Sequence, residues 1–161
     1  MKSTSTTADA DFTLTVRAVS TESNGGATAT ASQTLAVTVD SVNDAPAISS
    51  GGGADAATFT LAENTAAVTT VAAGDVDGGT ALTYSIVGGA DAERFVIDAH
   101  TGALSFATAP SFESPADADG NNSYVVQVQA SDGALADSQT ITINVTDVDE
   151  FDASAIGDDD T

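Results

Sequence analysis

Ser138-Gln-Thr-Ile-Thr-Ile-Asn-Val-Thr-Asp-Val-Asp-Glu150 closely repeats an earlier stretch of the chain, Ser32-Gln-Thr-Leu-Ala-Val-Thr-Val-Asp-Ser-Val-Asn-Asp44. The two stretches begin 106 positions apart (138 − 32), and each is an alternating strand that runs into a short acidic segment. A repeat of this length is large enough to fold as one domain of a tandem array. We therefore expect the chain to come from a longer series of domains, with the acidic segments at the joints between them.

This repeat divides the chain into four expected parts. Residues 1–40 hold the terminal hairpin of a preceding, incomplete unit, and residues 41–46 form a linker. Residues 47–148 form one complete domain, and residues 149–161 hold the next linker and the start of another unit. Because a lone hairpin is marginal in water, the first part is expected to pack on something or to stay mobile.

Alternation of apolar and polar residues predicts an all-β fold. It is clearest in four segments, namely 12–18, 35–39, 124–130 and 141–145. Such segments are typical of antiparallel strands with one buried face and one solvent-exposed face. Shorter strands are expected at residues 58–61, 68–72, 82–87, 95–97 and 103–106.

Glycine-rich turns separate these strands, so the complete unit is predicted to be an antiparallel Greek-key β-sandwich. Helical character is confined to residues 90–94, which can form at most a single turn. Six side chains of the last hairpin are expected to face inward: Tyr124, Val126, Val128, Ile141, Ile143 and Val145.

Composition indicates an acidic, extracellular protein. The chain has 24 Asp and Glu against three Lys and Arg, for a net charge of −21. Nucleic acid and anionic membrane surfaces are not expected partners, because phosphate binding needs cations, whereas divalent cations are the natural counter-charge. Cysteine is absent, so neither a disulfide nor a thiolate metal site can contribute. No apolar run is long enough to insert into a membrane.

The sequence does not predict an enzyme. His100, the one histidine, lies in an expected turn, and no Gly-rich phosphate loop stands between a strand and a helix. A glycosidase needs two opposed carboxylates across a substrate cleft. Here the acids follow the ends of strands, so we expect them to gather at the poles of the sandwich.

Several motifs inside the complete unit resemble those of the cadherin domain. Phe95-Val-Ile-Asp-Ala-His-Thr-Gly-Ala-Leu104 resembles the family hairpin F-x-I-D-x-x-T-G-x-L. Leu61-Ala-Glu-Asn64 is similar to the P-E-N motif, with Ala in place of Pro. Asp75-Val-Asp77 resembles D-x-D, and Ala130-Ser-Asp-Gly133 resembles A-x-D-G.

The joints resemble the same family. Val42-Asn-Asp-Ala-Pro46 and Asp147-Val-Asp-Glu150 are similar to its interdomain linker, D-x-N-D-N. In all, the resemblance covers residues 41–150, with the motifs in the family's order and spacing. It implies a cadherin/immunoglobulin-like sandwich, and the Ala- and Thr-rich style resembles the bacterial cadherin-like repeats of large secreted and surface adhesins.

Calcium at the joints is what this resemblance implies. Its chemistry also fits the residues, because calcium takes six to eight oxygen ligands from carboxylates, amides and carbonyls. At the entrance joint the implied ligands are Asn43, Asp44, Asp75, Asp77 and Asp132. At the exit joint they are Glu63, Glu113, Asp147, Asp149 and Glu150. Ser41 and Ser111 stand where the family has Asp, so incomplete and weakened sites are expected.

The loop Asp117-Ala-Asp-Gly-Asn121 leaves two interpretations equally open. It begins like an EF-hand calcium loop, but Asn122 and Val128 stand where that motif needs Gly and Glu. It is therefore either a further cation site or a solvated acidic loop.

The function expected from these features is a calcium-binding extender or adhesion module of a large bacterial surface protein, secreted or displayed on the cell. Calcium would rigidify its joints, and its partners would be neighbouring repeats of the same chain. The alternative is a module that binds a polysaccharide or another cell-surface ligand, in an adhesin or a secreted carbohydrate-active enzyme. Six Phe, two Tyr and no Trp offer few rings for stacking on sugars, which favours the extender.

Overall fold

The computed structural model describes residues 12–21, 28–37, 42–77 and 81–149. The chain divides into two compact units, residues 1–44 and 45–161. This division falls inside the predicted linker 41–46.

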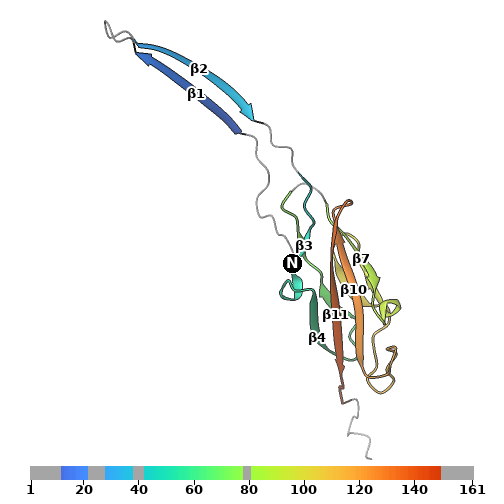
Figure 1. Ribbon diagram of the computed structural model, residues 1–161. Coiled ribbons are helices and arrows are strands. Elements are labelled where there is room, and N and C mark those ends of the chain that lie inside the picture. The colour runs from blue at the N-terminus through green and yellow to red at the C-terminus, as the bar shows by residue number, and fades with distance from the viewer. Residues whose placement is uncertain (1–11, 22–27, 38–41, 78–80, 150–161) are drawn as a thin grey trace, which may run out of the picture. The chain divides into compact units, whose positions relative to one another are not determined.

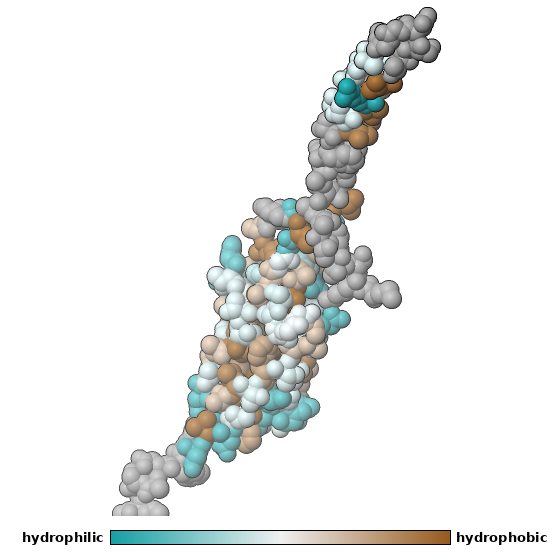
Figure 2. Space-filling model, turned by 90° about the vertical axis from the view of Figure 1, so that its left-hand side faces the viewer, coloured by the Kyte–Doolittle hydropathy of each residue, from teal (hydrophilic) through white to brown (hydrophobic). Residues whose placement is uncertain are grey.

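In the first unit, β1 (Phe12–Thr21) and β2 (Thr28–Val37) form an antiparallel hairpin (Figure 1). Leu14 pairs with Leu35, and Val16 lies on the same face by alternation. The buried face that alternation predicted is nevertheless exposed, because these side chains keep 49%, 55% and 56% of their surface accessible. Figure 2 shows hydrophobic atoms at the surface of this hairpin.

The second unit is an all-β sandwich, as predicted. Its larger sheet has the order β4-β11-β10-β7, its smaller sheet the order β5-β9-β8, and β3 pairs with β6. Its strands are β3 (Ala47–Ile48), β4 (Ala56–Ala62), β5 (Ala67–Thr70), β6 (Ala73–Gly74), β7 (Thr83–Gly88), β8 (Phe95–Ile97), β9 (Ala103–Phe106), β10 (Ser123–Ser131) and β11 (Ala136–Thr146). Two short 3-10 turns, η1 (Ser50–Gly52) and η2 (Ala92–Arg94), complete it.

One strand pair departs from the antiparallel expectation. β4 runs parallel to β11, with Ala57 opposite Ile141 and Leu61 opposite Val145. Parallel neighbours need a long crossover, and here the chain passes through β5 to β10 before β11 returns beside β4. Both strands therefore end at the same pole, and the acidic residues that follow them are brought together there.

The core lies between the two sheets. All six residues predicted to face inward are at most 4% exposed, which confirms that prediction. Phe95 and Phe106 of the smaller sheet stack at a centroid distance of 4.4 Å, and Phe106 meets Tyr124 of the larger sheet edge-on at 5.0 Å. Each fully buried large apolar side chain contributes about 1.5–3 kcal/mol of transfer free energy, so this thin core is the main source of stability.

The turn between β8 and β9 explains the D-x-x-T-G motif physically. Asp98 Oδ1 accepts hydrogen bonds from the backbone N–H groups of His100 at 2.9 Å and Thr101 at 2.8 Å. Gly102 has a φ of 72°, and a Cβ there would lie 2.2 Å from the carbonyl oxygen of Val71. Glycine is therefore required by both conformation and space, and His100 is an exposed turn residue, as expected.

Candidate metal centre

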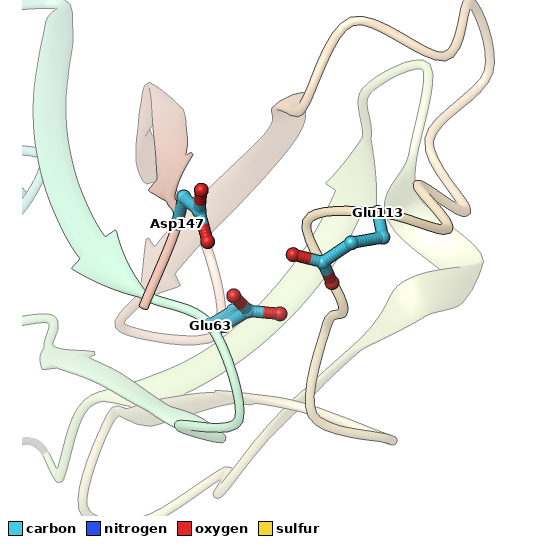
Figure 3. A group of neighbouring side chains, drawn as sticks. All are labelled: Glu63, Glu113 and Asp147. Carbon is cyan, nitrogen blue, oxygen red and sulfur yellow. The ribbon is translucent and has the colours of Figure 1, made fainter. Parts of the chain in front are cut away.

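Three carboxylates from three separate loops meet at the exit pole of the sandwich (Figure 3). Glu63 follows β4, Glu113 lies in the connection between β9 and β10, and Asp147 follows β11. Each offers an oxygen, and these oxygens all lie within 4.8 Å of one another. Glu63 is only 3% exposed, whereas Glu113 and Asp147 face solvent.

Backbone N–H groups hold the buried member of this group in place. Glu63 Oε2 accepts from Phe112 N at 2.8 Å, and Oε1 accepts from Val148 N at 2.9 Å. The carboxylate thus links the loop of Glu113 to the segment that follows β11. These two bonds, first from Phe112 and then from Val148, lower the pKa of Glu63 below its ordinary value of 4.5. Glu63 is therefore ionised at neutral pH.

An ionised group of this kind favours a hard cation. Two unit charges 4 Å apart repel by about 1 kcal/mol even in bulk water, and by more where water is excluded. Carboxylates in a site that opens to solvent on one side are the ligands that calcium prefers. Ser111, which replaces the family's Asp, donates its hydroxyl to Glu113 Oε2 at 3.3 Å. It orients Glu113 and supplies no charge of its own.

The other two residues predicted for the exit joint are Asp149 and Glu150. Asp149 is exposed and is not a member of the three-carboxylate group. Glu150 and the expected start of the next unit lie outside the described residues.

The entrance residues fall into both units. Asn43 and Asp44 end the first unit, and the other three belong to the second. Within the described part of the second unit, Asp75, Asp77 and Asp132 do not form a group of three acids with oxygens as close as those at the exit.

Two of the entrance acids also shape their own turns. Asp75 Oδ1 accepts from Asp77 N at 2.9 Å, while its buried Oδ2 has no hydrogen-bond partner among the described residues. Asp132 Oδ1 accepts from the N–H groups of Ala134 and Leu135, each at 2.7 Å. These bonds fix the two turns at the pole opposite the exit cluster.

The family model of the Cadherin domain matches residues 57–146, more than half of the chain. The chain belongs to the cadherin-domain family. Calcium binding, adhesion and an extracellular location are typical of cadherin domains.

Two curated relatives match parts of this cadherin domain chain. Human protocadherin Fat 1 is 33% identical over 79 residues, which are 47% of this chain and 2% of Fat 1. Halomucin of Haloquadratum walsbyi (strain DSM 16790 / HBSQ001) is 60% identical over 35 residues, 22% of this chain and 0% of halomucin after rounding. The chain thus spans only a very small part of either relative.

Solved cadherin structures share the fold. Repeats EC3-6 of protocadherin gammaB7 superpose with a TM-score of 0.63 at 22% identity, covering 85% of this chain and 33% of that one. Repeats EC22-24 of mouse cadherin-23 give a TM-score of 0.59 at 22% identity, covering 86% and 43%. Among the described residues of the cadherin chain, no helix has the length and hydropathy of a membrane span.

Sequence reasoning missed some residues on which the exit cluster depends. The N–H donors of Phe112 and Val148 carry no sequence signal, because any residue except proline offers the same group. The buried Asp91, 4% exposed, was also missed, since no motif surrounds it. Only the structure identifies it, through the backbone N–H groups that donate hydrogen bonds to its carboxylate.

Proposed function

We propose that this cadherin domain is a calcium-binding extender repeat of a large prokaryotic adhesin, secreted or held at the cell surface. The observation that carries the proposal is the convergence of Glu63, Glu113 and Asp147 at the end of the domain, beside the acidic linker. The internal repeat supports a tandem arrangement, and the similarity to halomucin of Haloquadratum walsbyi supports a prokaryotic origin.

Glu63, Glu113 and Asp147 would hold calcium, with Asp149 and Glu150 of the linker as further ligands. When bound, the ion supplies positive charge that offsets the repulsion among the carboxylates. Glu63 already bonds to the Val148 backbone, so it ties the start of the linker to the domain. Its backbone contacts therefore orient the site before any ion arrives.

An equivalent site is proposed for the entrance joint. Asp75, Asp77 and Asp132 of the domain would offer ligands there. The buried, unpartnered Oδ2 of Asp75 supports this, since an orphan carboxylate oxygen is costly without a cation or a donor.

Calcium titration tests the exit site. Calcium is expected to raise the thermal stability of the chain, with a Kd of roughly 10⁻⁴–10⁻³ M, as for extracellular modules. At ten times the Kd the gain is about 1.4 kcal/mol. Asp147→Asn should lose the part of this response that the exit site supplies, whereas the matched control Asp55→Asn, an exposed acid before β4, should keep the full response. An equal response of wild type and Asp147→Asn would refute the exit site.

Rigidity needs a separate experiment on consecutive repeats. Three copies of residues 45–150 in series recreate two joints in which the acidic linker meets Asp75 and Asp77. Small-angle scattering is expected to show a longer particle, with a narrower spread of lengths, in calcium than in chelator. If length and spread were unchanged while each domain stayed folded, calcium would not act as a joint stiffener.

The polysaccharide alternative has little support from the surface. Each Phe and Tyr whose burial the structure describes is buried or half-buried, so none presents a fully exposed ring for stacking. If the chain bound sugars on a glycan array, and if a chelator did not change that binding, polysaccharide binding would be better supported than the extender function.

A further inference from the structure

The loop Asp117–Asn121, between β9 and β10, contains a buried carboxylate that the exit cluster does not use. Asp117 is 9% exposed, and its Oδ2 accepts from Asn121 N at 2.7 Å. Its other oxygen, Oδ1, is also buried, yet it has no hydrogen-bond partner among the described residues. A buried carboxylate oxygen without a donor is unfavourable, because it has lost its hydrogen bonds to water and gained none in the fold.

A second carboxylate lies beside it. Asp119 Oδ2 accepts from Asn121 Nδ2 at 2.8 Å, so Asp117 and Asp119 bind the same asparagine. The side chains of the two acids are within hydrogen-bonding reach, which raises the pKa of Asp119; burial and charge repulsion by Asp117 act in the same direction. Two carboxylates this close hold either a shared proton or a cation.

A third acid, Asp91, holds the loop in place through hydrogen bonds from backbone N–H groups. Asp91 accepts from Ala118 N through Oδ1 and from Val125 N through Oδ2, each at 2.7 Å. Both of its oxygens are therefore engaged, and it acts as a positioning residue. Because Ala118 stands between the two other acids, Asp91 sets their orientation and adds negative charge nearby.

We propose that Asp117 and Asp119 bind a divalent cation of the calcium type, with backbone carbonyls of the loop and water completing the shell. The orphan oxygen of Asp117 is the inner ligand, and the exposed Asp119 closes the site from the solvent side. Such a site has only two carboxylates, so its affinity belongs to the weak extracellular range of roughly 10⁻⁴–10⁻³ M. It lies within one domain and needs no neighbouring repeat.

Tyrosine fluorescence offers a direct test. Tyr124 Oη accepts from Ala116 N at 3.0 Å, which places a sensitising ring next to the loop. Terbium(III), a hard cation with the same preference for oxygen ligands, is the probe. The full chain is titrated with terbium, tyrosine-sensitised emission is followed, and calcium is then added as competitor.

Wild type is expected to show sensitised emission that calcium displaces. Asp119→Asn should lower the terbium affinity measured from this emission by about tenfold or more, because one charged ligand is lost. Tyr124→Phe should reduce the emission while the calcium affinity measured by calorimetry stays the same. Asp55→Asn controls for the loss of one charge. Unfolding in chelator shows whether Asp119→Asn keeps the fold.

The exit cluster supplies the contrasting arm. Asp147→Asn should leave the Tyr124-sensitised emission in place. If Asp119→Asn matches wild type in emission and in calcium stoichiometry, the proposal is wrong. If only Asp147→Asn loses binding, the loop site is overturned and the proposed exit site stands. If only Asp119→Asn loses binding, the exit site is overturned and the loop site stands.

Discussion

At the scale of single residues, Glu63 decides how the exit pole is built. Its carboxylate accepts hydrogen bonds from the N–H groups of both Phe112 and Val148. This one side chain therefore links the loop between β9 and β10 to the segment after β11. These bonds favour the ionised form. Its two acidic neighbours, Glu113 and Asp147, bring further negative charge to the same position, where the proposed cation would be stabilised.

Glu63 makes stability depend on pH with a definite sign. Its pKa in the fold lies below 4.5, so its contribution is complete above about pH 4.5 and is lost as the pH falls through the folded pKa. In chelator, Glu63→Gln is expected to be less stable than wild type at pH 7, with a difference that shrinks in acid. Urea unfolding from pH 7 to pH 3 measures this difference.

The matched control for Glu63 is Asp98. Its pKa is also lowered, first by the Thr101 N–H and then by the His100 N–H. Asp98→Asn should therefore show the same shrinking difference in acid. Calcium at pH 7 should enlarge the deficit of Glu63→Gln and leave that of Asp98→Asn unchanged. A deficit of Glu63→Gln that is constant with pH would contradict this account.

At the scale of elements, a buried glutamine fastens a bend to the longest strand. Gln139 of β11 is 1% exposed, and its Nε2 donates to Ser50 O at 3.1 Å and Ala54 O at 2.7 Å. The bend around η1 therefore has its carbonyls satisfied from inside the sandwich. Gln33 occupies the same position in the repeated stretch, but there it is exposed.

This pair of glutamines gives a comparison within one chain. Gln139→Ala removes the donor from two carbonyls and leaves a void, so it should lower the free energy of unfolding by about 2 kcal/mol. Gln33→Ala should change it by less than about 0.5 kcal/mol, as for an exposed site. Denaturant unfolding checks the two values, followed in the second unit for Gln139→Ala and in the first unit for Gln33→Ala. Equal effects would show that Gln33 also contacts a covering layer.

At the scale of the whole molecule, the described strands of the two units differ in whether a second sheet covers them. β1 and β2 carry the same alternation as β10 and β11, yet the described side chains of the first hairpin are exposed and those of the second alternate between buried and half-buried along β10. The difference is the second sheet, which β5, β9 and β8 supply to the sandwich.

Hydrogen exchange should separate the two hairpins. Backbone amides of β2 are expected to exchange rapidly, because a two-stranded ribbon without a packed face is marginal in water. Amides of β11 should be protected up to the global free energy of unfolding. Mass spectrometry of peptides that cover residues 28–37 and 136–146 measures both in one sample. Equal protection at low protein concentration would show that the first hairpin is covered.

Much of this protein follows from its sequence alone. The two-residue period predicted the strands and the inward side of β10 and β11, because side-chain direction along a strand is a local property. The D-x-x-T-G motif predicted the turn at Asp98 for the same reason: its hydrogen bonds span only a few residues. The family resemblance also assigned Glu63, Glu113 and Asp147 to one joint.

Other features were decided only by the tertiary structure. Alternation cannot tell a covered face from a bare one, so the exposure of Leu14 and Leu35 depended on a layer of strands elsewhere in the chain. The parallel pairing of β4 with β11 and the burial of Gln139 arise from contacts between residues far apart in sequence. The same is true of the orphan oxygen of Asp117, because burial belongs to the packed whole while residue type and spacing belong to the chain.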